Sequence, residues 1–461
     1  MRIAFIYPSI QFDMEHHFIP LPMGLLSLTA VVQKKYDSNV DIFDSRHGAE
    51  LPDLSTVNQY DVIGFTAMSM QITHALNLAK TLKDAGFTGK LVFGGPHASV
   101  APDHLKEQPF IDAIFIGESE ETFIEYLHFL QGKPHALQRL WLRDDDKQWN
   151  WYQGKNFISN LNTLPFPARE KYEKYVKKSR TINMTTTRGC PFKCNYCQPT
   201  KRVLYGDEIR RRSVDSIILE IENAVSLFAI NNFSIDDDTF TFNKKIVLDF
   251  CERVAPLNLT WTCQSRSDID RETLEQMHAS GCNMIYVGVE SGSQRVLNLM
   301  NKLNTVEKNA EFIKNCNEIG IKSWCNMMVG YPGETVEDME KSLQFVRETK
   351  PSRVCVNQVT PFPGTYLWKD REDDIIAKDW DDIARHVVKP KFRSMANKQW
   401  YINYHIIMLS KQHDGPLNYD VIDSSWLLSP FKKLLPIVFI FPSVVPTLRR
   451  IFLKKKKGST Y

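Results

Sequence analysis

The chain has 461 residues, 43% of them hydrophobic and 24% charged, which is enough for two or three globular domains. Its nine cysteines are scattered and its N-terminus runs directly into an apolar segment, so we expect no disulfide framework, no secretion and a cytoplasmic protein. The net charge of +3 is uneven, because the residues after Asp423 carry eight basic side chains and no acidic one. The rest of the chain is therefore net acidic, which argues against nucleic acid as its partner.

The first third of the chain alternates strand-like apolar runs with helical patterns. This alternation predicts a parallel, doubly wound, Rossmann-like α/β domain over residues 1–135, which would bind a ligand at the carboxyl ends of its strands. The predicted strands are 3–7, 40–44, 61–66, 90–93 and 113–116, and the predicted helices are 23–35, 72–85 and 121–130.

Two of these strand ends carry small residues that suit a flat ligand. Gly94-Gly95 ends the fourth strand, and the missing side chains would let a cofactor come close. No G-x-G-x-x-G follows the first strand, which argues against a dinucleotide and leaves a domain without a cofactor as the alternative. The domain resembles cobalamin-binding domains, with Thr66-Ala67-Met68 at the family's Ser-x-Leu and Gly94-Gly95 at its Gly-Gly. The resemblance implies cobalamin, with Thr66, Gly94 and Gly95 in contact with it.

The family's cobalt-ligand motif is absent. An Asp-x-His-x-x-Gly is expected after the first strand, but His16 and His17 there have the wrong spacing. We therefore assign no histidine as the lower axial ligand of cobalt. Loop histidines of this kind are usually solvated.

Residues 136–180 break the α/β pattern and are predicted to be a linker that contains a proline-punctuated stretch over 164–169. A predicted strand at 182–186 then delivers Cys190, Cys194 and Cys197 at spacing C-x3-C-x2-C. Three thiolates can hold three irons of a [4Fe-4S] cluster and leave the fourth iron open. The alternatives are ordinary cysteines in a turn, or a zinc site, which would need a fourth ligand nearby.

With Tyr196 before Cys197, this motif resembles the C-x3-C-x-aromatic-C signature of the radical S-adenosylmethionine (radical SAM) enzymes. The resemblance implies a partial (β/α)6 TIM-like barrel over residues 181–395, a 5'-deoxyadenosyl radical made from S-adenosylmethionine, and an external electron donor of the flavodoxin or ferredoxin type. The 117–122 segment resembles the G-E-x-E-x-T run of cobalamin domains fused to radical SAM domains. Together these features resemble the class B radical SAM methyltransferase-like family.

The resemblance also implies residues for S-adenosylmethionine. Asp237 and Asp238 match a segment that contacts the methionyl amine, although an acidic surface turn is the alternative. Glu290 matches the family's G-x-E-S-G run, whose Glu approaches the ribose. Arg266 ends a predicted strand, where it could pair with a carboxylate of the cofactor. Tyr196 completes this predicted set.

Two other groups of residues have ordinary explanations. Arg210, Arg211 and Arg212 precede a predicted helix over 214–228 and are expected to be a solvated helix start. The remaining cysteines are expected to behave as small buried hydrophobes; they are residues 251, 263, 282, 316, 325 and 355.

The last predicted unit, residues 396–461, is helical and ends in a basic tail. Residues 430–461 combine apolar side chains with lysines and arginines, but three prolines keep the apolar run below the about 20 residues that a spanning helix needs. The pattern predicts peripheral contact with the inner face of the membrane, or else a helix packed on the barrel with a basic tail.

The sequence therefore predicts a cobalamin-dependent radical SAM enzyme that methylates an unactivated carbon of a small-molecule or lipid-like substrate. One alternative is a non-methylating radical SAM oxidoreductase, cyclase or C–C coupling enzyme. A second is a non-catalytic iron–sulfur or cobalamin-binding regulator.

Overall fold

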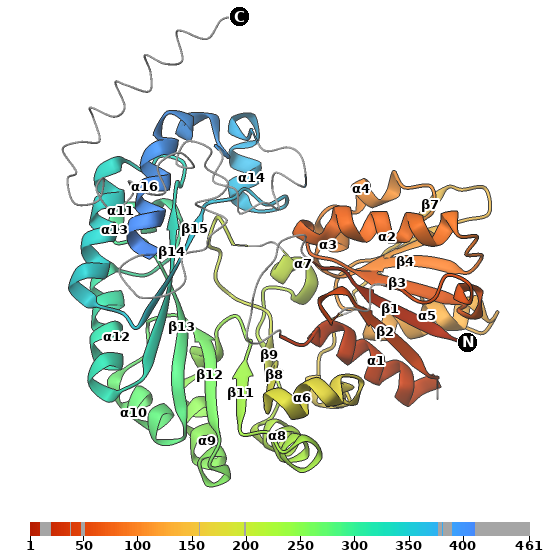
Figure 1. Cartoon of the computed structure of the whole chain (residues 1–461), viewed down its shortest axis with the longest axis horizontal. Coiled ribbons are helices and arrows are strands. Elements are labelled where there is room, and N and C mark those ends of the chain that lie inside the picture. Colours follow the sequence, from red (N-terminus) through yellow and green to blue (C-terminus); the bar gives the residue numbers. More distant parts are fainter. Residues whose placement is uncertain are drawn as a thin grey trace, which may run out of the picture.

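The computed structural model describes residues 1–9, 20–36, 38–47, 51–155, 157–197, 200–376, 380 and 390–410. Figure 1 shows two units side by side, an α/β domain in red to orange and a barrel in green to blue. The predictions for His16, His17 and the tail over 430–461 lie outside the described residues. Within the described part, no helix has both the length and the apolar composition needed to cross a membrane.

The N-terminal domain is built on a seven-stranded sheet of order β2-β1-β3-β4-β5-β6-β7. Its first five strands are parallel and confirm the predicted doubly wound sheet: β1 (Ile3–Tyr7), β2 (Val40–Asp44), β3 (Val62–Thr66), β4 (Lys90–Gly94) and β5 (Ala113–Phe115). The order reverses between β1 and β3, which is the switch point where such sheets bind ligands.

An antiparallel hairpin extends this sheet past residue 135, into the segment predicted to be linker. It consists of β6 (Leu140–Arg143) and β7 (Trp149–Tyr152) and pairs with β5. These strands have only four residues each, too few to show a clear period in the sequence. The hairpin covers the edge that β5 would otherwise leave open.

Helices cover both faces of this sheet. One apolar core lies under α1 (Met23–Tyr36) and α5 (Glu120–Leu130), and a separate core lies under α2 (Ile72–Asp84), α3 (Gly95–Val100) and α4 (Pro102–Lys106). Two cores on opposite faces are what a doubly wound sheet requires.

The second unit is a six-stranded, fully parallel sheet of order β15-β14-β13-β12-β11-β8, the predicted partial barrel. Its strands are β8 (Thr181–Met184), β11 (Asn232–Ile235), β12 (Thr260–Ser265), β13 (Cys282–Glu290), β14 (Lys322–Val329) and β15 (Arg353–Gln358). Buried and half-buried residues alternate along β11 and β14. The buried residues, such as Phe233 and Trp261, belong to the core shared with the outer helices.

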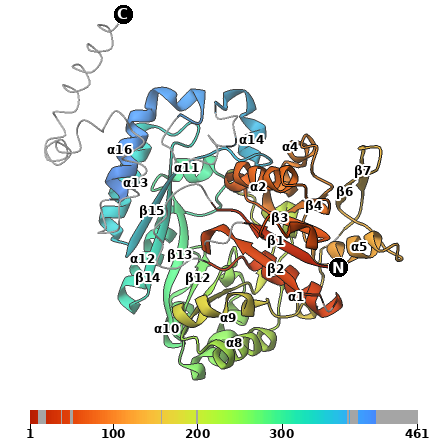
Figure 2. The same cartoon turned by 45° about the vertical axis from the view of Figure 1, so that its right-hand side comes forward.

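Those helices lie along the outside of the barrel in both views (Figures 1 and 2). They are α8 (Val214–Phe228), α9 (Lys244–Val254), α10 (Arg271–Ala279), α11 (Gln294–Leu299), α12 (Val306–Ile319) and α13 (Val336–Thr349). Shorter elements complete the described chain: β9 (Thr187–Arg188), β10 (Arg210–Arg211), η6 (Phe240–Phe242), α6 (Glu173–Ser179), α7 (Thr200–Tyr205), α14 (Tyr366–Asp370) and α16 (Gln399–Ser410).

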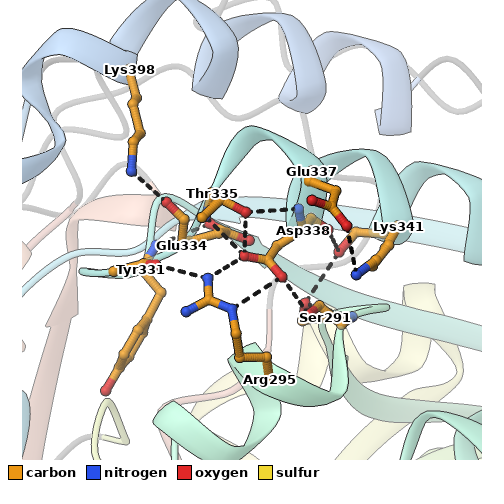
Figure 3. A network of polar contacts seen from close by, with 12 residues as sticks. Ser291, Arg295, Tyr331, Glu334, Thr335, Glu337, Asp338, Lys341 and Lys398 are labelled. Carbon is orange, nitrogen blue, oxygen red and sulfur yellow. Dashed lines mark hydrogen bonds and ion pairs between the residues drawn. The ribbon is translucent and has the colours of Figure 1, made fainter.

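A polar network fixes the turn between β14 and α13 (Figure 3). Thr335 caps α13 in a reciprocal capping box with Asp338, which also pairs with Arg295. One carboxylate oxygen of Glu334 accepts the backbone N–H groups of Gly330, at 2.6 Å, and Tyr331, at 3.2 Å. The other carboxylate oxygen is buried without a hydrogen bond among the described residues, and burial raises the pKa of Glu334 to about 7.

Leu21, just before α1, docks directly on the first barrel strand. Asn183 of β8 accepts a hydrogen bond from the Leu21 N–H, at 3.0 Å, and donates one to the Leu21 carbonyl, at 3.2 Å. Beside it, the Tyr172 hydroxyl donates to the buried carboxylate of Asp44, at 2.9 Å. These buried contacts orient the two domains relative to one another.

Candidate active site between the two domains

The three motif cysteines lie in the loop between β9 and α7, beyond the carboxyl end of β8. Cys194 is buried, Cys190 and Cys197 are half-buried, and none of the three forms a disulfide. The loop begins at Gly189, whose φ of +97° is left-handed. A Cβ there would lie 2.1 Å from the Glu208 carbonyl oxygen, so only glycine fits this entry to the loop.

Distant segments hold the loop in place. The backbone N–H of Asn195 donates to the Met300 carbonyl, at 2.9 Å, and its side chain donates to the Leu299 carbonyl, at 3.0 Å. Asn301 donates to the Lys193 carbonyl, at 2.8 Å, and the Leu367 N–H donates to the Asn195 carbonyl, at 2.9 Å. The loop is therefore ordered by contacts that no local pattern specifies.

The donor set of this loop fits an iron–sulfur cluster. Three thiols on one short loop can each ligate a different iron. Among the described residues, no three His, Cys, Asp or Glu side chains are gathered closely enough for a single metal ion. The fit therefore rests on the chemistry and spacing of the three cysteines, and their role as cluster ligands stays a prediction.

Tyr196 and Glu290, both predicted to contact the cofactor, are brought together by Lys302. The Lys302 ammonium lies 2.9 Å from a carboxylate oxygen of Glu290 and 3.3 Å from the Tyr196 hydroxyl. Burial, Glu290 and the thiols of Cys194 and Cys197 raise the pKa of Tyr196. Glu290 has a left-handed φ of +67°, which is strained for a residue with a side chain and is typical of functional sites.

Sequence reasoning missed Lys302. It is a lysine in a polar turn, and only its 7% exposure and its pairing with Glu290 distinguish it from a surface residue. Gly288 makes room for the pair, because a Cβ there would lie 2.4 Å from the Glu290 carboxylate and 2.8 Å from the ammonium.

Arg266 is buried and donates to the backbone carbonyls of Lys302, at 3.0 Å, and Leu303, at 2.7 Å. Its guanidinium also lies 4.0 Å above the Phe192 ring of the cysteine loop. The structure thus places Arg266 where it holds the turn that presents Lys302. Its predicted pairing with a cofactor carboxylate stays a prediction.

Asp237 is buried and its carboxylate is already occupied. It accepts the backbone N–H groups of Thr186, at 2.7 Å, and Thr187, at 3.0 Å, together with the Thr186 hydroxyl. Burial raises the pKa of Asp237 against the opposing effect of these hydrogen bonds. Asp237 therefore anchors the strand that leads into the cysteine loop, while Asp238, half-buried beside it, stays the predicted contact to the methionyl amine.

A cavity of about 300 Å³ opens at the switch point of the N-terminal sheet. Thr66, Gly94 and Gly95 line it, as predicted for cobalamin contacts. A Cβ on Gly95 would lie 2.3 Å from the Thr66 hydroxyl oxygen, whereas one on Gly94 would meet only Phe115, at 3.6 Å. A wall without Cβ atoms fits a flat macrocycle. Among the described residues that line the cavity, none is a histidine, a cysteine or a lysine.

The G-E-x-E segment forms a buried ion-pair clamp between the domains. Glu120 pairs with Arg188, at 2.6 Å, and Glu118 accepts from Arg210, at 3.0 Å. Burial raises the pKa of Glu120, but the charge and hydrogen bonds of Arg188 outweigh burial and leave that pKa below its ordinary value. Glu118, Glu120 and Arg188 also line the cavity, and Arg188 directly precedes Gly189 and the first cysteine.

This clamp overturns the expectation that residues 210–212 form a solvated helix start. Arg210 is held by Glu118, and Arg212 pairs with buried Glu220, which also pairs with Arg169, at 2.6 Å. Glu118 comes from a segment that is distant in sequence, whereas Glu220 lies on the helix that follows, α8, where it is buried and also pairs with Arg169. The Arg211 guanidinium lies over the Phe242 ring, 5.7 Å from its centroid.

The other six cysteines agree with their predicted role. Cys251, Cys263, Cys282, Cys316 and Cys325 are buried, and Cys355 is half-buried on β15. Burial raises the pKa of the Cys251 thiol to about 11 and that of Cys316 to about 12, so these thiols are inert.

Comparisons with known proteins agree with this architecture. A model of the radical SAM superfamily matches residues 184–346, and a model of the B12 binding domain matches residues 16–127. An uncharacterized methyltransferase of Pyrococcus horikoshii is 29% identical over 361 residues, which cover 76% of this chain and 78% of the relative. The anaerobic magnesium-protoporphyrin IX monomethyl ester cyclase of Cereibacter sphaeroides is 26% identical over 366 residues, which cover 72% of this chain and 57% of the relative.

A solved structure has the same fold. It is the radical S-adenosylmethionine methyltransferase TsrM from Kitasatospora setae, with cobalamin and a [4Fe-4S] cluster bound. The TM-score is 0.67 at 15% identity, and the match covers 81% of this chain and 74% of that chain.

Fold and site define an enzyme that joins a cobalamin-binding domain to a radical-generating barrel. Residues 184–346 match the radical SAM superfamily, and the B12-binding domain that residues 16–127 match lies ahead of them in the chain. These two domains imply a [4Fe-4S] cluster, S-adenosylmethionine and cobalamin as the cofactors.

Proposed function

We propose that the chain is a C-methyltransferase that places a methyl group on an unactivated carbon of a small-molecule or lipid-like substrate. The observation that carries this proposal is the shared wall between the two cofactor sites. Arg188 lines the cavity of the B12-binding domain and is separated from Cys190 only by Gly189. A methyl donor in that cavity would therefore lie next to the site of radical formation, as transfer to a substrate radical requires.

The cofactors supply the radical and the methyl group, and the protein supplies placement. Cys190, Cys194 and Cys197 would hold the cluster. Tyr196, Asp238, Glu290 and Lys302 would orient S-adenosylmethionine above it, and Thr66, Gly94 and Gly95 would bind the corrinoid. The clamp of Glu118 and Glu120 keeps the two sites in a fixed relation and closes the cavity on the side of the cysteine loop.

Metal content tests the cysteine loop. Anaerobic reconstitution of the wild type is expected to yield about four irons per chain. Cys194→Ala should lose the cluster and the formation of 5'-deoxyadenosine, while Cys251→Ala, which removes a buried thiol of the core, should keep both. Retention of four irons by Cys194→Ala would refute the assignment.

Methyl transfer is tested separately. Incubation of the reconstituted enzyme with methyl-labelled S-adenosylmethionine and a cell extract should give a labelled product heavier by one methylene unit, but only when cobalamin is supplied. A product without label would favour the cyclase or oxidoreductase alternative, which the relationship to a magnesium-protoporphyrin IX monomethyl ester cyclase keeps open.

A lipid-like substrate would agree with the basic, apolar segment over 430–461. We propose that this segment brings a cytoplasmic enzyme to the inner face of the membrane through anionic lipids. Flotation with anionic vesicles should then carry the full chain but not a chain that ends at residue 429. Equal flotation of both would refute membrane contact through the tail.

A further inference from the structure

The inner face of the barrel sheet is only partly buried. Along β14, and from Met284 to Val289 of β13, a buried residue alternates with one that is half-buried or exposed. The buried ones, such as Val287 and Met327, pack in the core beneath the outer helices. Because successive side chains of a strand point to opposite faces, the others lie on the inner face. A closed barrel fills its interior with packed side chains, whereas this inner face stays accessible to a ligand.

One row of residues crosses this inner face from β11 to β14, which are consecutive strands of the sheet (Figure 1). Gln264 pairs in register with Tyr286, and Tyr286 pairs with Trp324. Asp236 is level with Gln264, because each directly follows the last pair in the register of β11 and β12. Neighbouring strands lie about 4.8 Å apart, so the row measures about 14 Å from its carboxylate end to its indole end. It therefore has the length of a small molecule.

Asp236 presents a half-buried carboxylate that makes no ion pair within the described part of the chain. One oxygen accepts a hydrogen bond from the Ser234 hydroxyl, at 2.6 Å, and the other accepts one from the Asn183 side-chain amide, at 3.0 Å. Each oxygen keeps a second acceptor site. Burial raises the pKa of Asp236 more than these hydrogen bonds lower it. A ligand that brings a positive charge would remove the cost of holding such a carboxylate away from water.

The other end of the row is aromatic. The rings of Tyr286 and Trp324 have centroids 5.1 Å apart. Burial raises the pKa of Tyr286, and the charge of Asp236 adds to this effect, as expected for groups on one face. The Arg353 guanidinium lies over the Trp324 ring, 5.1 Å from its centroid, so the aromatic end already has a cation. A positively charged group of a ligand is therefore expected at the Asp236 end, with an apolar or planar part on the rings.

Asp236 also lies between the two cofactor sites. Asn183, which donates to it, exchanges two hydrogen bonds with the backbone of Leu21, and Leu21 lines the cavity of the B12-binding domain. On the other side, Asp237 follows directly in the chain and holds the strand that leads into the cysteine loop. A molecule anchored at Asp236 would therefore lie near both the radical and the methyl donor, as the substrate must.

We infer that Asp236 determines specificity by binding an ammonium group of the substrate, with the apolar or planar part of that substrate on Tyr286 and Trp324. The substrate class is then a primary amine. The inference rests on the proposed function, because it names the substrate of that same radical reaction. S-adenosylmethionine carries an ammonium group too, so the test keeps this cofactor bound throughout.

The test measures the affinity of three probes for the reconstituted full-length enzyme by calorimetry. Phenethylammonium, phenethyl alcohol and hydrocinnamate share a phenyl ring on a short chain and end in a cation, a neutral hydroxyl or an anion. S-adenosylmethionine and cobalamin are supplied, and the cluster is left oxidised so that no turnover occurs. Asp236→Asn is compared with Asp249→Asn, which removes the same charge from an exposed position of α9, and with Ser234→Ala, which keeps the carboxylate.

We expect phenethylammonium to bind the wild type about tenfold more tightly than phenethyl alcohol, and hydrocinnamate to bind most weakly, because only the ammonium forms a charge-assisted hydrogen bond. Asp236→Asn should lose this preference, while Asp249→Asn and Ser234→Ala keep it. Tyr286→Leu should weaken the binding of all three probes alike. The melting temperature of Asp236→Asn should stay the same or rise, because the variant removes a carboxylate that has no cation.

Three results would overturn the inference. One is equal affinity of the wild type for the ammonium and the alcohol. Another is a preference that survives in Asp236→Asn, since a lower melting temperature of that variant would then show a purely structural role. The third is weaker binding of S-adenosylmethionine by Asp236→Asn, because the carboxylate would then serve the cofactor.

A second assay connects the substrate class to the reaction. Acylation of the primary amines in a cell extract, followed by quenching of the reagent, should abolish the product labelled by methyl-labelled S-adenosylmethionine, whereas esterification of carboxylates should not. Product that survives acylation would contradict the inference. An untreated extract that gives no product counts against the proposed function, while the probe affinities still decide the role of Asp236.

Discussion

At the scale of single residues, the site depends on buried charges whose partners are close. Lys302, Glu290 and Tyr196 form one connected group beside the cysteines, and Arg266 holds the backbone that presents Lys302. Charges removed from water are stable only when paired, so each member of this group constrains the others. The motifs of the sequence predict Glu290 and Tyr196 as site residues, but no motif predicts that Lys302 contacts both of them.

Lys302→Met should destabilise the protein by about 3–5 kcal/mol, because it leaves the Glu290 carboxylate buried without its cation. Chemical unfolding of the apo protein under anaerobic conditions measures this loss. The double variant Glu290→Gln/Lys302→Met removes both charges and should recover most of the stability. A single variant as stable as the wild type would show that Glu290 is solvated or paired elsewhere.

Glu334 predicts a pH dependence of stability. Its pKa is raised by burial to about 7 from an ordinary value near 4.5, so the folded state prefers the protonated acid. Stability from this group is complete below about pH 4.5 and is lost as the pH rises through 7. Relative to Glu334→Gln, which does not titrate, the wild type should lose on the order of 1 to 3 kcal/mol between pH 5 and pH 8. Thermal unfolding of both proteins across this range measures the difference, and parallel curves would contradict it.

At the scale of elements, the cysteine loop is shaped by its neighbours. Gly189 provides the entry, β10 pairs with β9 beside it, and the turn over 299–303 supports the far side. The strands expected at 3–7 and 40–44 end where predicted, because short apolar runs between turn residues define them locally. The hairpin β6–β7 was not predicted, because it is stabilised by pairing with β5, which is distant in sequence.

Gly189→Ala should remove most of the bound iron and leave the barrel folded. The Cβ would meet the Glu208 carbonyl at 2.1 Å, and the φ of +97° is unfavourable for alanine. Iron content per chain and circular dichroism provide the two measurements. Gly132→Ala serves as a matched control, since its φ is +66° but no atom lies within 4 Å of the added Cβ. It carries only the backbone cost of about 1 kcal/mol.

At the scale of the whole molecule, the ion-pair clamp of Glu118 and Glu120 connects the two domains. Glu120 is the first residue of α5, where the helix N-terminus favours a carboxylate, and Glu118 lies just before the helix. They pair with Arg188 and Arg210, which lie on the antiparallel strands β9 and β10. The same residues line the cavity of the B12-binding domain. Cofactor binding and domain docking therefore share one set of side chains.

Glu120→Gln should weaken both properties, because Arg188 would keep its buried charge without the full countercharge. We expect cobalamin to bind about tenfold more weakly, equivalent to about 1.4 kcal/mol, and the melting temperature of the apo protein to fall. Titration of the cobalamin absorbance and calorimetry measure the two effects. Glu121→Gln, an exposed neighbour in the same helical turn, should change neither. Unaltered affinity in Glu120→Gln would separate the clamp from the cofactor site.

The sequence by itself determined the class of the protein, because its signals are local. Hydrophobic periodicity predicts the alternating strands and helices, and the C-x3-C-x2-C spacing places three thiolates on one short loop. Gly94 and Gly95 likewise predict a ligand close to the backbone, because they have no side chains to keep it away.

Only the tertiary structure decided which charges meet. Arg210 and Arg212 look like a solvated helix start until Glu118 and Glu220, each from a separate element, are placed against them. The motif around Asp237 predicts a contact with the cofactor. In the structure, its carboxylate instead accepts hydrogen bonds from the backbone of the strand that leads into the cysteine loop. Lys302 becomes part of the site because the fold brings it to Glu290. Periodicity and spacing act over a few residues, whereas the partner of a buried charge is chosen by long-range packing, which no local pattern encodes.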